Sequence, residues 1–303
     1  MAESPRWIDL IDPTVEELEA HLPEKLHPPA LSLLLAPHVH DDEPRPRIES
    51  HGHYAVGVLL VAIVVPDEDR VFYQEVDFIL TPDKLVTVSK TPPGETPFDP
   101  KNAIQACARD DHVGMYAFRL LDEVAEHYLD LIDDLNDEID QLEDHVEDWT
   151  PAMIRDRVSA LRHDLLHIRR TLSPTRDAVH KIMDDRVELD HFELFPPDVA
   201  RHFADVYDKL LRASEGLETS RDLVAGVRDY FQSKVSNEQN EVVKRLTVIA
   251  SLLLVPTFIV GLYGQNFHDI PEIGWSFGYW WSWGVIIGTT LLQLAFFRWK
   301  KWM

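Results

Sequence analysis

Apolar residues are distributed unevenly along this chain, and the longest apolar runs lie near its C-terminus. Residues 246–267 and 273–297 contain no charged side chain, hold 22 and 25 residues, and are separated by five residues. Crossing the roughly 30 Å hydrocarbon core of a bilayer takes about 20 apolar residues. The pattern therefore predicts a transmembrane hairpin. The length and adjacency of the two runs argue against the alternative, a helical hairpin buried in a soluble protein.

The flanking charges predict the orientation of this hairpin. Basic residues stand just outside the two runs: Lys244, Arg245, Arg298, Lys300 and Lys301. The turn between the runs contains Asp269 and Glu272 but no Lys or Arg. Because Lys and Arg near short loops stay on the cytoplasmic side, we expect a multi-pass protein of the cell membrane with both termini in the cytoplasm.

The residue pattern over 1–115 predicts a mixed α/β domain. Residues with β-branched and aromatic side chains are concentrated in 54–65, 71–80 and 85–89, and a short edge strand is expected at 7–10. A proline-rich segment follows the last of these strands, and helical patterns take over beyond it.

A pair of helices is expected within residues 116–196. From Leu121 the apolar residues recur at steps of three and four, which places them on one side of a helix. Thirteen Asp and Glu residues, and no Lys or Arg, occur in 121–153. A break before Pro151 starts a second, basic helix that we expect to reach about Asp190. Their opposite charges predict that the two helices pack antiparallel.

The last helical segment begins near Pro197 and is predicted to run to Tyr263. A continuous helix of that extent would be about 100 Å long. It would not be stable alone, so it must pack against copies of itself or against the preceding pair. We therefore expect a stalk at 197–245, followed by the membrane hairpin at 246–303 with its turn at 264–272.

One face of the first apolar run is polar at its ends and apolar in the middle. Its positions recur by three and four: Asn240, Val243, Leu246, Ala250, Leu254, Thr257 and Gly261. Two spans per chain cannot enclose a hydrophilic path, so conduction would require a ring of subunits. This face either lines such a path or packs helices together, as small residues commonly do in membranes. The pattern alone leaves both interpretations open.

Composition narrows the classes of function. The formal net charge of −24 argues against a nucleic-acid partner. Such a charge would concentrate cations by its long-range field, or would serve only to keep the cytoplasmic part soluble. The single cysteine excludes an intrachain disulfide and a thiolate metal cluster. The sequence has no Gly-rich phosphate loop and no evident Ser/His/Asp or Cys/His arrangement, so an enzyme is the class that it favours least.

The turn between the runs has a recognisable sequence. Tyr263-Gly264-Gln265-Asn266-Phe267 resembles the Tyr-Gly-Met-Asn-Phe signature at the pore mouth of the CorA family of magnesium transporters. Further segments similar to that family occur in the same order along the chain: 7–10, 45–49, 167–170 with Pro174, 240–242 and 270–273. The resemblance covers the full length.

The resemblance implies a fold and an activity. The fold would be a funnel-shaped homopentamer in the lipid bilayer, with an α/β cytoplasmic domain, long stalk helices that continue into the pore, and the second span around them. The activity would be uptake of divalent cations, chiefly Mg²⁺, driven by the membrane potential and gated by cytoplasmic Mg²⁺.

The resemblance also implies roles for individual residues. Asn266, with Gly264 and Gln265, would form the selectivity filter. Further along the pore, Thr257 and Gly261 would line the path. Leu246 and Leu254 would form a hydrophobic constriction, while Asn240 would add a second amide ring below it.

Carboxylates have expected roles outside the filter. Asp269 and Glu272 would attract cations to the entrance through their charge. Asp229, on the stalk, corresponds to a regulatory Mg²⁺ site of the family, and a solvated stalk carboxylate is the alternative interpretation.

Gln265 departs from the family signature, which has methionine there, and this leaves the preferred ion open. A zinc transporter of the same architecture is one alternative, and Co²⁺ or Ni²⁺ are further possible cargoes. The histidine pairs His38 with His40 and His51 with His53, and His268 beside the motif, make zinc worth testing. A membrane-tethered Mg²⁺ sensor or scaffold that does not conduct is the alternative from a different class.

Overall fold

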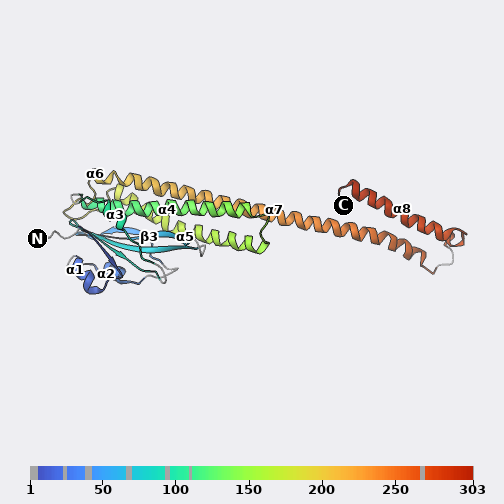
Figure 1. Ribbon diagram of the computed structural model, residues 1–303, viewed down its shortest axis with the longest axis horizontal. Coiled ribbons are helices and arrows are strands. Elements are labelled where there is room, and N and C mark those ends of the chain that lie inside the picture. The colour runs from blue at the N-terminus through green and yellow to red at the C-terminus, as the bar shows by residue number, and fades with distance from the viewer. Residues whose placement is uncertain are drawn as a thin grey trace. The chain divides into compact units, whose positions relative to one another are not determined.

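The fold is taken from a computed structural model in which the chain forms two compact units, Met1–Arg228 and Asp229–Met303 (Figure 1). The residues that the structure describes are 6–22, 26–37, 43–65, 70–92, 96–108, 111–266 and 270–302.

The first unit contains one five-stranded sheet. Its strands are β1 (Trp7–Ile11), β2 (Arg47–Ser50), β3 (Ala55–Val65), β4 (Arg70–Leu80) and β5 (Leu85–Ser89). The order across the sheet is β1-β5-β4-β3-β2, with β1 parallel to β5 and the other pairs antiparallel. The four strands expected from the sequence are confirmed. Strand β2 was not expected, because four residues reading Arg-Ile-Glu-Ser give little β signal.

Helices cover the sheet on both faces, which explains why β5 is buried at every position. Helices α1 (Val15–His21) and α2 (Pro28–Leu35) lie on one side (Figure 1). Leu18 and Leu34 from these helices pack with Val56, Ile79 and Val88 of the strands. The long helix α4 (Val113–Asp144) contacts β3, β4 and β5.

Three charged side chains are buried beneath α2. Lys90 Nζ lies 2.5 Å from Glu75 Oε1 and 2.8 Å from Asp77 Oδ2, and it donates a hydrogen bond of 2.9 Å to the Leu33 carbonyl. The residues Glu75, Asp77 and Lys90 are exposed by only 2%, 0% and 2%. Neither carboxylate oxygen of Asp77 accepts a well-oriented hydrogen bond in the described part of the chain. Desolvation therefore dominates and raises the pKa of Asp77 to about 7, although Lys90 opposes the shift.

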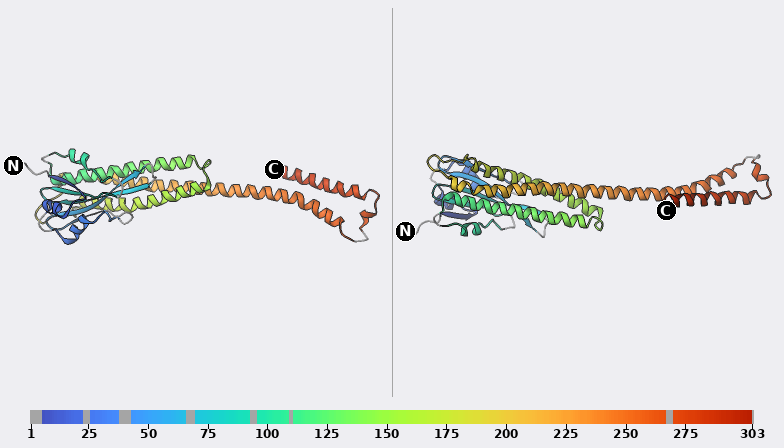
Figure 2. Two further views of the ribbon diagram at one scale, coloured as in Figure 1. Left: turned by 60° about the horizontal axis from the view of Figure 1, so that its bottom comes forward. Right: turned by 90° about the horizontal axis from the view of Figure 1, so that it is seen from above.

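The remaining helices of this unit are α3 (Lys101–Gln105), α5 (Pro151–Met183), α6 (Pro197–Ala200) and the first part of α7 (Phe203–Tyr263). Lys209 Nζ of α7 lies 2.6 Å from Asp122 Oδ1 of α4, and Ser220 Oγ donates to Asn136 Oδ1 at 2.7 Å, so α4 and α7 run parallel. Arg169 of α5 lies 3.5 Å from Glu218 of α7. Helices α4, α5 and this part of α7 lie side by side in every view (Figures 1 and 2).

Helix α4 begins at Val113, three residues before the expected start of the helical pair at 116, because His112 Nδ1 accepts a hydrogen bond from the Gly114 amide and caps the helix. Gly114 allows the chain to approach closely here, since a Cβ at this position would stand 2.3 Å from the Leu194 carbonyl oxygen.

Helix α5 ends at Met183 rather than near Asp190. Asp185 has a φ of 56°, in the left-handed region, and its amide donates to the Ile182 carbonyl. The Arg186 amide donates to the Lys181 carbonyl, which completes a Schellman motif and stops the helix. The segment beginning at Pro197 is likewise interrupted, because α6 and α7 are separate helices.

The second unit contains the rest of α7, a short 3₁₀ helix at Pro271–Gly274 and helix α8 (Gly278–Trp299). Both long helices are apolar and long enough to cross a membrane, and little of either apolar window is buried. A core helix of a soluble protein would be mostly covered. Helix α8 starts five residues into the second charge-free run, because the chain turns tightly at Gly278, where a Cβ would stand 2.1 Å from the Glu272 carbonyl oxygen.

We predict that Asp77 makes the stability of the α/β domain depend on pH. Between its ordinary pKa of 3.8 and about 7, the folded protein holds a proton that the unfolded chain releases, so folding stability falls as pH rises through this window. Asp77→Asn stays neutral and should escape this loss, which amounts to about 4 kcal/mol at most for a shift of roughly three units.

The measurement is thermal unfolding of the full chain in detergent at pH 5 and at pH 7.5. The difference between Asp77→Asn and wild type should move in favour of the variant at the higher pH. Asp133→Asn, at an exposed position on α4, is the control and should follow wild type. Parallel pH curves for wild type and Asp77→Asn would contradict the assignment.

Candidate functional site

The structure places the seven expected pore-lining residues on exposed positions of α7. These are Asn240, Val243, Leu246, Ala250, Leu254, Thr257 and Gly261. Large apolar side chains are among them, since Leu246 is 61% and Leu254 68% exposed. Exposure of this kind on one chain means that lipid or another copy of the chain must cover these side chains.

The opposite face of α7 packs against α8. Val248 and Ile259 are the buried residues of α7 between 240 and 263. Gln293 Nε2 of α8 donates a hydrogen bond of 3.3 Å to the Ser251 carbonyl on the same side. At 3.6 residues per turn, this packed face lies roughly opposite the exposed face described above. Helix α7 thus has one narrow covered side, and the seven expected positions lie among the uncovered ones.

Gln293 was not identified from the sequence. Its signal is that it is the one amide side chain within the second charge-free run. In the described part of the chain, its Oε1 is buried and accepts no hydrogen bond. A polar side chain in such a run must find partners on neighbouring helices, and the Ser251 carbonyl is the partner that this chain provides.

The hydroxyl of Thr257 is oriented by a hydrogen bond within α7. Thr257 Oγ1 donates to the Leu253 carbonyl at 2.7 Å. Because its proton is engaged there, the hydroxyl oxygen presents acceptor lone pairs on the exposed face, which suits contact with water molecules of a hydrated cation.

The turn after α7 begins at Gly264. Its amide donates to the Val260 carbonyl at 2.9 Å, and a Cβ at Gly264 would stand 3.1 Å from that carbonyl oxygen. The close contact gives a local reason for glycine at this position. Gln265 and Asn266 follow and are exposed. Glu272 is half-exposed in the 3₁₀ helix, whereas Asp269, like Phe267 and His268, lies outside the described residues.

Asp229 is exposed on α7. In the parts of the chain that the structure describes, no group of three or more His, Cys, Asp or Glu residues is arranged to hold a metal ion.

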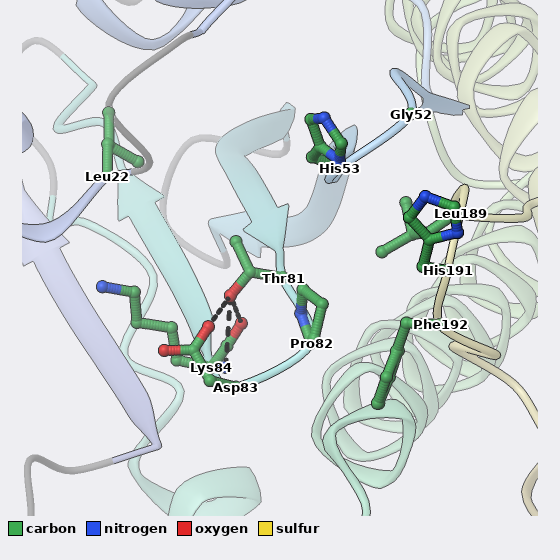
Figure 3. Close-up of a pocket in the computed structure, with 10 residues that line it drawn as sticks. All are labelled: Leu22, Gly52, His53, Thr81, Pro82, Asp83, Lys84, Leu189, His191 and Phe192. Atoms are coloured by element: carbon green, nitrogen blue, oxygen red, sulfur yellow. Dashed lines mark hydrogen bonds between the residues drawn. The ribbon is translucent and has the colours of Figure 1, made fainter.

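His51 and His53 of the α/β domain each lie near a different carboxylate. His51 Nε2 lies 3.9 Å from Glu49 Oε2, and His53 Nδ1 lies 4.0 Å from Asp190 Oδ2. His53 and His191 line a pocket of about 480 Å³ beside the Thr81–Asp83 turn (Figure 3). The Asp83 carboxylate there accepts a hydrogen bond of 2.7 Å from the Thr81 hydroxyl. His38 and His40 lie outside the described residues.

Comparison with known proteins connects this geometry to one family. The family model described as CorA-like Mg²⁺ transporter protein matches residues 2–301. The cobalt/magnesium transport protein CorA of Thermotoga maritima is 30% identical over 100% of this chain and 84% of its own length. The zinc transport protein ZntB of Yersinia enterocolitica is 27% identical over 65% of this chain and 58% of its own length.

A solved structure shows the same fold. The complete structure of the CorA magnesium transporter from Methanocaldococcus jannaschii superposes with a TM-score of 0.76, at 20% identity, over 98% of this chain and 91% of that chain. The expected fold class is thereby confirmed: a soluble α/β domain, a long helix and two C-terminal apolar helices. With a family model that matches nearly every residue, this chain belongs to the CorA-like Mg²⁺ transporter family.

Proposed function

We propose that this protein is a channel for hydrated divalent cations, with Mg²⁺ as the principal cargo. The observation that supports it most is the two-sided character of α7. On one side Val248 and Ile259 are buried, and the Ser251 carbonyl accepts a hydrogen bond from Gln293 of α8. The other side is open and presents polar side chains at its ends, Asn240 and Thr257, around an apolar middle. In a membrane transporter family, such a face is suited to line the ion path.

The conducting unit is a homopentamer in the cell membrane, with both termini in the cytoplasm. One chain contributes two membrane helices and cannot surround a path by itself, so several copies of α7 must form the wall. Each α8 then stands outside, where its aromatic side chains, such as the exposed Trp280 and Trp299, meet lipid at the interfaces. The pentameric arrangement of family members supplies the number.

The filter is a ring of amide groups at the outer mouth. Mg²⁺ holds its waters tightly and demands octahedral geometry, so a filter that strips those waters would be costly. Neutral oxygens of Asn266 accept hydrogen bonds from the waters and leave the shell intact. Gln265 adds a second amide beside this ring. Carboxylates at Glu272 and Asp269 raise the local concentration of cations without binding any one of them tightly.

The middle of the path is a hydrophobic constriction. Leu246 and Leu254 present apolar side chains on the open face, and a narrow ring of them closes by losing its water. Thr257 and Gly261 line the wider part above, and Asn240 supplies an amide ring below. Val243 and Ala250 complete the face.

Ion entry needs no chemical energy source. A potential of about 100 mV contributes roughly 2.3 kcal/mol per elementary charge, and therefore about 4.6 kcal/mol for a divalent cation moving inward. The protein acts as a passive conductor rather than as an enzyme.

Zinc is the second candidate cargo. Gln265 departs from the family signature, and a relative named as a zinc transport protein matches 65% of this chain. Competition between Mg²⁺ and Zn²⁺ for flux into vesicles containing the purified protein decides between them, with Co²⁺ and Ni²⁺ as further competitors. A protein that binds Mg²⁺ in this assay but passes no ion would instead be a membrane-tethered sensor or scaffold.

The amide ring gives the first prediction. Asn266→Ala removes the acceptor oxygens that face incoming waters, and each lost hydrogen bond matters by about 1 kcal/mol, multiplied around the ring. Mg²⁺ uptake by vesicles should collapse, while native mass spectrometry still shows five chains. Gln265→Met, the matched control in the same turn, should conduct and change only the ranking among Mg²⁺, Co²⁺ and Zn²⁺. Uptake at the wild-type rate by an Asn266→Ala pentamer would refute the role of the ring.

The two faces of α7 give the second prediction. Thr257→Cys should react with a water-soluble thiol reagent in membranes, whereas Ile259→Cys, on the face toward α8, should not. The background is low because burial and the nearby Asp111 raise the pKa of Cys107 to about 11, so little reactive thiolate exists at neutral pH. Labelling of Ile259→Cys but not Thr257→Cys would reverse the proposed orientation of α7.

Cytoplasmic Mg²⁺ gives the third prediction. The acidic side chains of neighbouring stalks repel one another. Mg²⁺ bound with the help of Asp229 should hold the stalks together, so raising the internal Mg²⁺ concentration should close the pore. Asp229→Asn should shift closure to higher Mg²⁺, whereas Glu238→Gln, on an exposed position of the same helix, should not. Flux that is equally insensitive to internal Mg²⁺ in all three proteins would overturn the regulatory role while leaving transport intact.

A further inference from the structure

A groove in the first unit joins two segments that the ion path does not use. Residues 43–46, which precede β2, meet residues 167–174 of α5, and Leu60 of β3 also lines the space. Its volume is about 570 Å³. Both segments contain motifs that the sequence analysis singled out, Arg45-Pro46-Arg47 and His167-Ile168-Arg169-Arg170. The volume lies in the range of small-molecule sites.

The charge of this groove is opposite to that of the chain. Acidic residues outnumber basic ones by 53 to 29 over the whole sequence. The groove reverses the ratio, because Arg45, Arg169 and Arg170 line it together with one carboxylate, that of Glu43. All three arginines are exposed, whereas Pro46, Thr171 and Pro174 are buried beneath them. The groove thus has a buried floor and a basic rim.

The arginines of this groove differ in their ion pairing among the described residues. Arg169 lies 3.5 Å from Glu218 of α7, which partly neutralises it. Arg45 and Arg170 form no ion pair with a carboxylate in the described part of the chain. A guanidinium presents a planar fork of donors that matches the oxygens of a phosphate group, and two such forks lining one groove suit an anion with more than one phosphate.

Neighbouring groups hold the groove in shape. The His167 ring packs at 5.4 Å from the Tyr73 ring and at 5.6 Å from the His163 ring. Pro174 lies inside α5 and has no amide proton, so it donates no hydrogen bond to the Arg170 carbonyl one turn before it. Half-buried Ser173 adds a hydroxyl donor between these positions. Histidine, serine and arginine side chains are all donors to phosphate oxygens.

We propose that this groove binds a polyphosphate-bearing small molecule, such as a nucleoside triphosphate, through Arg45 and Arg170. A cation is disfavoured here, since three guanidinium groups repel it. The inference is independent of the proposed conduction, because it concerns a site on the α/β domain and its test is equilibrium binding.

The experiment is isothermal titration of the full chain in detergent at fixed Mg²⁺ with ATP, inorganic tripolyphosphate, AMP and adenosine. Affinity should rise with the number of phosphates and fall with added NaCl. Equal affinity for ATP and tripolyphosphate means that the groove contacts phosphates alone, and tighter binding of ATP means that it also contacts the nucleoside. Either result supports the proposal. Binding of adenosine as tight as that of ATP would overturn it.

Variants assign the binding to the groove. Arg170→Gln and Arg45→Gln should each weaken tripolyphosphate binding about tenfold or more. Arg170→Lys keeps the charge but loses the fork and should give an intermediate loss. Arg162→Gln, an exposed arginine of α5 outside the groove, is the matched control and should bind as wild type does. Unchanged thermal unfolding and particle mass establish that each variant is folded.

Three results would overturn the proposal. One is the absence of saturable binding of ATP and tripolyphosphate up to about 5 mM. The second is binding that Arg45→Gln and Arg170→Gln leave unchanged, which would place it elsewhere. The third is an equal loss in Arg162→Gln, which would make the attraction a property of surface charge in general.

Discussion

The structure of the membrane unit depends on one constraint: apolar side chains must be covered by protein or lipid, and the described part of this chain provides two long apolar helices for this purpose. Little of α7 is covered within the chain itself. Val248 and Ile259 are buried, and the Gln293 amide of α8 donates to the Ser251 carbonyl. The remaining face can be covered only from outside the chain. The same helix is thereby fixed on one side and left open to assembly on the other.

In the first unit, the first section of α7 packs against neighbouring helices. That section is anchored by few but well-defined polar contacts, Lys209 to Asp122 and Ser220 to Asn136, placed within apolar packing by Val206, Leu210 and Leu217. Polar contacts of this type favour one register of neighbouring helices, because a shift of one residue would separate these part-buried partners. Apolar packing alone would tolerate such a shift more readily.

Long-range patterns in the sequence predicted most of this fold, and local hydrogen bonds decided what they did not predict. The four strands and the two membrane runs follow from periodicity and run length, which integrate over many residues. The start of α4 depends on a single histidine cap, and the end of α5 on one aspartate with left-handed geometry. Neither choice changes the hydrophobic pattern. The four-residue strand β2 exists because it pairs with β3, which tertiary contact alone determines.

The candidate site divides in the same way. Seven positions on α7 are recognisable because a helical face has a period, and the turn because it resembles a family signature. Gln293 and the Arg45–Arg170 groove could not be predicted from the sequence, because each depends on a contact between residues far apart in the chain. Gln293 contacts a residue 42 positions before it, and the groove joins residues 43–46 to residues 167–174.

The distribution of charge follows from how each group is solvated. Excess carboxylates lie in water, for example on the exposed positions of α4. Water solvates the ionised form there, so ionisation costs little free energy. Buried Asp77 lacks that solvation, so its pKa rises to about 7 even with Lys90 at 2.8 Å. The desolvation of these buried charges offsets much of the attraction between them, so the net contribution of the ion pair to stability is small. The basic groove differs from Asp77 because its guanidinium groups are exposed to water. They therefore stay charged and can bind the anion that we propose.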